Sequence, residues 1–99
     1  MPKSYNFTVR SKFAPLVSID SMAGAVYVKF NPGAAVAKTK VVSEWPHVAV
    51  DLDDKGDVIG IEGIHIENME LRNVAEQAAV KVPRRLVDMA RYAPAPVSA

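Results

Sequence analysis

Three acidic residues around one predicted turn have the spacing of a calcium-binding loop. Asp51, Asp53 and Glu62 stand at positions 1, 3 and 12 of an EF-hand-like segment, and Gly56 stands at position 6. Lys55 occupies position 5, where a calcium ligand is required, and the flanking residues predict strands in place of helices. We therefore interpret the acids as part of a hairpin turn, and we predict no metal and no cofactor.

The two histidines offer a second possible site for a metal ion or a general base. His47 and His65 could share it with Glu62 and Glu67 if their strands adjoin, but no third or fourth ligand follows at a recognisable spacing. No serine occupies a Gly-x-Ser-x-Gly elbow, and the sequence contains no glycine-rich phosphate loop and no cysteine. An enzyme or metal-binding protein is accordingly the third hypothesis for function, and we predict no catalytic residue.

The segment 68–92 is the candidate for nucleic-acid binding. It resembles a helix-turn-helix in its small residues and in its basic second helix, where Arg84, Arg85 and Arg91 could contact phosphates. Against this, the second helix is short, Pro83 occupies an early position in it, and no third helix supports the pair. The alternative is that both helices pack on a sheet with their arginines in water. DNA binding is the second hypothesis.

Trp45, His47 and Tyr92 are the candidate residues of a protein-binding surface. Trp45 stands beside Pro46 in a predicted loop, and exposed aromatic residues contribute disproportionately to interfaces. The alternative is that Trp45 caps the edge of the core. The leading hypothesis for function is a non-enzymatic protein-binding or regulatory module.

Alternating apolar and polar residues predict the elements that position these side chains. Tyr5, Phe7 and Val9 alternate with polar residues, and further strands are expected over about 16–19, 25–30, 36–43, 48–52 and 58–67. Beyond Asn68, which we expect to cap a helix, apolar residues recur at helical spacing and predict one or two helices over 69–92. The expected fold is an α+β domain over 1–92. Its sheet, over about 5–67, is an antiparallel meander of five to six short strands, and 93–99 form a disordered tail.

The register of the hairpin around 52–58 is open. A four-residue loop places Ile59 and Ile61 on the same face as Leu52, whereas a three-residue loop with a glycine bulge places Val58 and Gly60 there. The four-residue loop is preferred, because it places more apolar side chains on that face. Both registers leave apolar side chains on the second face of the sheet. We therefore expect the C-terminal helix or a second copy of the chain to cover it, and a homo-oligomer, most simply a dimer, is predicted.

The composition limits the classes of function. The 99 residues suit one domain, 49% are hydrophobic, 7% are aromatic, and the formal charge of +1 provides no broad field to attract nucleic acid or an acidic membrane. Nothing in the sequence suggests a signal peptide or a membrane span, so a cytoplasmic location is expected.

Residues 19–66 carry a family resemblance. Asp20–Phe30, which contains Ala25-Val26-Tyr27-Val28, and Val50–Glu62, which ends in Gly-Ile-Glu, resemble the small bacterial family called domain of unknown function 2283. Gly24 stands where that family usually has an acidic residue. The resemblance implies a compact antiparallel sheet followed by a helix, and it implies no established activity. Some relatives occur in toxin–antitoxin-like gene pairs, which points to a protein partner and an antitoxin-like role.

Overall fold

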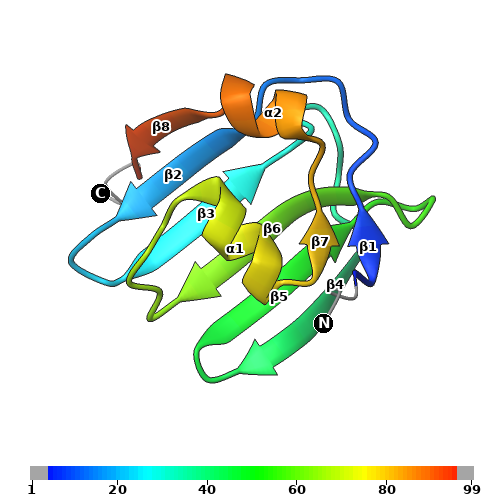
Figure 1. Cartoon of the computed structure of the whole chain (residues 1–99). Coiled ribbons are helices and arrows are strands. Elements are labelled where there is room, and N and C mark those ends of the chain that lie inside the picture. The colour runs from blue at the N-terminus through cyan, green and yellow to red at the C-terminus, as the bar shows by residue number, and fades with distance from the viewer. Residues whose placement is uncertain (1–4, 96–99) are drawn as a thin grey trace.

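The computed structural model describes residues 5–95, and six strands in this range form one sheet (Figure 1). The elements, in chain order, are β1 (Phe7–Thr8), β2 (Leu16–Asp20), β3 (Ala25–Lys29), β4 (Lys38–Glu44), β5 (His47–Leu52), β6 (Val58–Ile64), α1 (Leu71–Gln77), β7 (Val80–Lys81), α2 (Arg84–Met89) and β8 (Arg91–Pro94). The strand order in the sheet is β4-β5-β6-β3-β2-β8, and every neighbouring pair is antiparallel except β2 and β8. The domain is α+β, with short helices.

The sheet is not the continuous meander that the sequence predicts. The hairpins β2–β3 and β4-β5-β6 form as expected, but β3 pairs with β6, and β4 lies at the far edge. Residues 30–37 connect β3 to β4. This connection is too long for a tight hairpin, and it contains Pro32, which has no backbone N–H donor. The central pairing of β3 with β6 brings Val28 opposite Ile61, and both side chains are fully buried.

The turn between β5 and β6 has the predicted chemistry. The Oδ1 atom of Asp53 accepts hydrogen bonds from the backbone N–H groups of Lys55 and Asp57, both at 2.9 Å, and Gly56 adopts a φ of +83°. The register combines the two alternatives, because a shift after Asp51 pairs Leu52 with Val58. Val58 and Ile61 therefore both join the core cluster.

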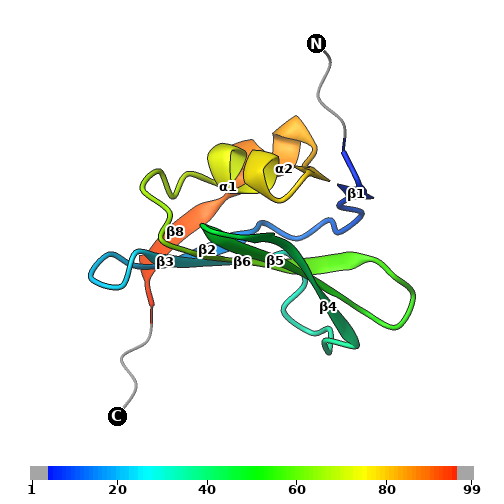
Figure 2. The same cartoon turned by 90° about the horizontal axis from the view of Figure 1, so that it is seen from below.

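The helical segment covers one face of the sheet. Figure 2 shows α1 and α2 on this face, and no helix formed by residues 5–95 lies on the other. Leu71 and Val74 of α1 and Leu86 of α2 are buried against the strands, as their helical spacing predicts. The helices are shorter than expected, because Ala79 has a φ of +57° and the chain then enters β7.

Three predictions about the ends of the elements are wrong. The N-terminal strand is reduced to β1, which pairs in parallel with β7 outside the main sheet. Ala93 and Pro94, expected in a disordered tail, belong to β8. This strand is ordered because it forms hydrogen bonds with backbone groups along the edge of β2. The rest of the predicted tail, 96–99, lies outside the described residues. Asn68 does not cap α1; its side chain accepts from the N–H of Glu70 at 3.0 Å in the turn before the helix.

Candidate functional site

The face of the sheet away from the helices carries a cluster of hydrogen-bonded side chains from three strands. Tyr27 on β3 donates its hydroxyl proton to Oδ2 of Asp51 on β5 at 2.7 Å, and Thr39 on β4 donates to Oδ1 of the same carboxylate at 2.6 Å. The Tyr27 ring crosses β6 at Gly60, where a Cβ atom would lie 2.0 Å from the tyrosine oxygen. Because Gly60 has no side chain, the Tyr27 ring can lie over β6 and reach Asp51.

The side chains of Tyr27, Thr39 and Asp51 link three strands, and we call the hydrogen-bonded pair of Tyr27 and Asp51 the clamp. Burial of the Tyr27 hydroxyl, its hydrogen bond to Asp51, and the charges of Asp51 and Glu62 all raise the pKa of Tyr27 above its ordinary value. The phenol therefore stays protonated and acts as a donor, and both oxygens of Asp51 are occupied as acceptors. This arrangement holds strands together and presents no activated nucleophile.

Trp45 is an exposed aromatic side chain at one end of the sheet. It occupies the turn between β4 and β5, and 76% of its surface is exposed. Its ring lies against the ring of His65, with the centroids 4.4 Å apart and the planes at 39°. His65 follows the last residue of β6 and has a left-handed backbone, with φ at 65°. The indole is thus exposed to solvent and at the same time supported by a second ring.

Three segments of the chain come together at this end of the sheet, which we call the Trp45 end: residues 20–24, 44–47 and 64–70. Strand register brings them together, since Asp20 pairs with Ala25, Ala25 with Ile64 and Ile64 with His47. The backbone N–H of Ile66 also donates to the carbonyl of Gly24 at 3.1 Å. In Figure 1 the three segments lie at the lower left of the molecule.

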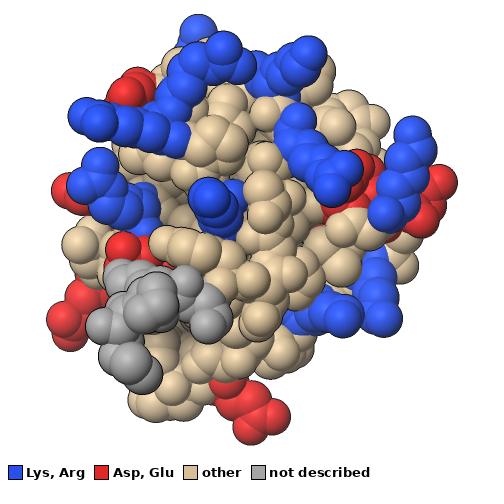
Figure 3. All heavy atoms as spheres, turned by 45° about the vertical axis from the view of Figure 1, so that its right-hand side comes forward, with Lys and Arg blue, Asp and Glu red and all other residues tan. Residues whose placement is uncertain are grey.

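The Trp45 end is acidic. Its three segments contain Asp20, Glu44, Glu67 and Glu70 and no lysine or arginine. His47 also belongs to this end, and its Nε2 atom lies 3.9 Å from a carboxylate oxygen of Glu62. Figure 3 shows basic side chains across the upper half of the view and down its right-hand side, whereas the bottom of that view shows acidic side chains and no basic ones. The protein therefore has an uneven charge distribution in spite of its net charge of +1.

A hollow of about 570 Å³ opens at the Trp45 end between the β2–β3 turn and the segment that follows β6. Ser21 and Gly24 line one side of it, and His65, Glu67 and Met69 line the other. Met22, in the same turn, is 98% exposed. An incoming side chain could therefore enter beside the ring pair, with apolar and acidic groups around it.

The structure brings together two of the three residues predicted for a partner surface. Trp45 and His47 share the Trp45 end, but Tyr92 lies on β8 at the far side of the sheet. The Tyr92 hydroxyl accepts a hydrogen bond from the backbone N–H of Leu71 at 2.9 Å. Tyr92 therefore has a structural contact at the start of α1, where helical N–H groups lack partners within the helix.

The residues predicted to contact nucleic acid are divided between two surfaces. Arg84 and Arg85 lie on α2, whereas Arg91 begins β8 and lines a different hollow, beside Phe13 and Lys29. The helix-turn-helix expected over 68–92 does not form, because the two helices are separated by strand β7, which pairs with β1. The sequence did not predict β7, because a strand of two residues is too short to show an alternating pattern.

The acids of the EF-hand-like spacing do not converge on one point. Asp53 accepts hydrogen bonds within its own turn, and Asp51 accepts those of Tyr27 and Thr39 on the sheet. Within residues 5–95, no group of three or more histidine, aspartate or glutamate side chains is placed to hold a metal ion. No helix in the same range is both long and apolar enough to cross a membrane.

Fold and site together define a small α+β domain with a six-stranded, mostly antiparallel sheet and an acidic end that presents a supported tryptophan. No family model matches the chain, and searches of the curated proteins and of the solved structures give no match. The resemblance of residues 19–66 to domain of unknown function 2283 stays a prediction.

Proposed function

We propose that this protein is a non-enzymatic binding module that recognises a basic surface of a protein partner through its Trp45 end. The observation that carries the proposal is the Trp45 side chain, which is 76% exposed and rests against His65. A large apolar ring held in place before binding loses little conformational freedom when a partner covers it. This is the property expected of an interface anchor.

The charge around Trp45 supports a basic partner. Asp20, Glu44 and Glu67 lie in the segments that form the Trp45 end, and those segments contain no lysine or arginine. Opposite charges at the rim of an interface accelerate association and exclude partners of like charge. An arginine or lysine can also lie over an exposed indole face, where the ring attracts the cation.

Self-association through the uncovered face of the sheet has less support than the sequence suggested. Val58 and Ile61, two of the apolar residues that could have lain there, face the core. Ala49 and Gly60 are small, and the Tyr27 ring lies across Gly60. The homo-oligomer remains a proposal that light scattering on the purified chain tests directly, and a monomer would contradict it.

The binding proposal is tested with the fluorescence of Trp45, the single tryptophan of the chain. We expect an arginine-rich peptide to shift the emission, and a glutamate-rich peptide of the same length to leave it unchanged. The shift should weaken as salt is raised, because exposed charges are screened. Equal responses to both peptides would contradict a basic partner.

Capture from cells then tests the site itself. Trp45→Ala should lose the proteins that the wild-type chain retains, whereas Phe13→Ala should retain them, because Phe13 is 55% exposed but lines a hollow with Arg91 outside the Trp45 end. The antitoxin-like regulatory role gains support if the captured protein is encoded beside this chain. If Trp45→Ala captures the same proteins as wild type, the proposal fails.

A gel shift of random duplex DNA at low salt would favour nucleic-acid binding in its place.

A further inference from the structure

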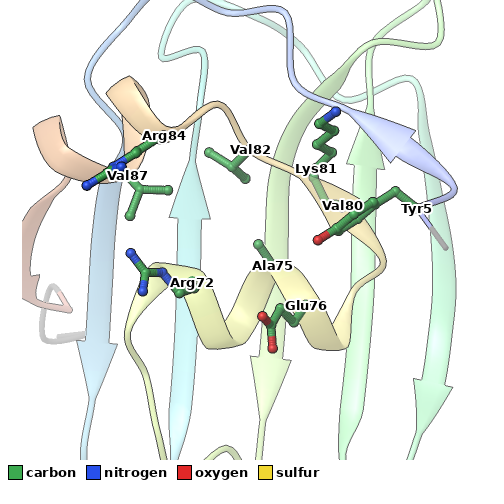
Figure 4. Close-up of a pocket in the computed structure, with 9 residues that line it drawn as sticks. All are labelled: Tyr5, Arg72, Ala75, Glu76, Val80, Lys81, Val82, Arg84 and Val87. Atoms are coloured by element: carbon green, nitrogen blue, oxygen red, sulfur yellow. The ribbon is translucent and has the colours of Figure 1, made fainter. Parts of the chain in front are cut away.

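A second hollow, of about 330 Å³, lies on the helical side of the molecule, away from the sheet face that carries the Tyr27–Asp51 clamp. It is bounded by α1, by β7 and the residues that follow it, and by the start of α2 (Figure 4). Tyr5 closes one side, and its hydroxyl points toward the middle of the view in Figure 4. We call this feature the helical hollow.

Basic side chains dominate the polar lining of the helical hollow. Arg72 comes from α1, Lys81 from β7 and Arg84 from α2, so the hollow has a basic residue on each of three elements. In Figure 4 the guanidinium groups of Arg72 and Arg84 lie on the same side of the view, whereas the Lys81 side chain extends away from them. Figure 4 shows Arg72 extending from α1 toward α2, where Arg84 and Val87 stand. Glu76 is the one carboxylate among the lining residues, and it extends away from the Arg72 guanidinium.

The rest of the lining is apolar. Ala75 and Val80 are buried and belong to the hydrophobic core, and Val82 and Val87 pack against that core from its edge. A hollow with apolar walls and a few convergent charged groups is the usual form of a small-molecule site. Inorganic ions alone would leave these apolar walls in water.

We propose that the helical hollow binds a small organic anion that consists of one carboxylate or phosphate group on an apolar body. Arg72 and Arg84 bind the acidic group, because planar guanidinium groups donate paired hydrogen bonds to carboxylate and phosphate oxygens. The valine side chains contact the apolar body. This site is separate from the Trp45 end and does not depend on the proposed protein partner.

The neighbouring arginine provides a matched control. Arg85 follows Arg84 on the same helix and is exposed, but it does not line the helical hollow. Arg85→Gln therefore removes the same charge from the same helix without touching the site. A ligand attracted only by the general basic character of α2 would respond equally to Arg84→Gln and Arg85→Gln.

The experiment follows the backbone amide signals of the ¹⁵N-labelled protein during titration with benzoate, phenyl phosphate, benzyl alcohol and inorganic phosphate. We expect benzoate, phenyl phosphate or both to shift the signals of Ala75 and Val82 and to bind more tightly than benzyl alcohol and inorganic phosphate. The comparison of the two aromatic anions identifies which acidic group the site prefers. The spectra also confirm that each variant is folded.

The double variant Arg72→Gln/Arg84→Gln should weaken binding of the preferred anion by about tenfold or more, since hydrogen bonds to charged groups contribute strongly to affinity. Arg85→Gln should leave the affinity within about twofold of wild type. The proposal is overturned if neither aromatic anion binds, if benzyl alcohol or inorganic phosphate binds as tightly as the better of them, or if Arg85→Gln weakens binding as much as the double variant.

Discussion

Replacing Gly60 with alanine should break the clamp between Tyr27 and Asp51. A Cβ atom at residue 60 would lie 2.0 Å from the Tyr27 oxygen and 2.6 Å from its Cζ atom, so the ring cannot keep its position. If the ring moves, the 2.7 Å hydrogen bond to Asp51 is lost. The change therefore affects stability through a residue on another strand.

The expected cost follows from two opposing effects. A hydrogen bond to a charged group contributes roughly 1.5–3 kcal/mol, whereas alanine is preferred over glycine within a strand by roughly 0.5–1 kcal/mol. Gly60→Ala should therefore lower the free energy of unfolding by about 1–2 kcal/mol. Urea denaturation followed by circular dichroism should show a midpoint lower by roughly 1 M.

A double-mutant cycle distinguishes this mechanism from a general loss of stability. In the Tyr27→Ala background the displaced ring is absent, so Gly60→Ala should be neutral or slightly stabilising. In the Tyr27→Phe background the ring carbons still collide but no hydrogen bond remains to be lost, so the cost should be intermediate. If Gly60→Ala lowers the free energy of unfolding equally in wild type, Tyr27→Ala and Tyr27→Phe, the clamp is not the reason why residue 60 must be glycine.

Two further changes test the sheet. Gly63→Ala places a Cβ atom 2.8 Å from Ile66 and 3.1 Å from Val26. Overpacking in this part of the core should lower the free energy of unfolding by about 1–3 kcal/mol. An unchanged urea denaturation curve would show that neighbouring side chains move to make room for the added methyl group. Tyr27→Phe should be less stable than wild type below about pH 10, and the difference should shrink as the pH rises above 10, because the pKa of Tyr27 is raised from its ordinary value of 10.0 on folding. Urea denaturation between pH 8 and 11 measures this, and a constant difference across that range would exclude a raised pKa.

Local features of the fold were predictable from the sequence. Asp53 and Gly56 form the predicted turn, because side-chain capping and a positive φ depend on a few consecutive residues. The alternation around Ala25–Lys29 and the helical spacing around Leu71 likewise identified a strand and a helix. The role of Gly63 was not readable from its own segment: this glycine stays in register within β6, and the close approach of Ile66 leaves no room for a Cβ atom.

The candidate sites were only partly predictable. Trp45 and His47 were singled out because of their residue types, but nothing in the sequence indicated that His65 supports the indole. The clamp was missed, because Tyr27 and Asp51 are 24 residues apart and Thr39 and Asp51 are 12 apart. Only the register between strands places them on one face.

The amino-acid sequence by itself determined where most strands and turns occur and which side chains of each strand are apolar, since these depend on backbone geometry within short segments. The tertiary structure decided that β3 lies beside β6, that β8 extends the sheet and that β7 separates the two helices. These choices depend on burial and hydrogen bonding summed over the whole chain, which no single segment encodes. The Trp45 end and the helical hollow arise from the same long-range choices, because each is assembled from segments that are distant in the sequence.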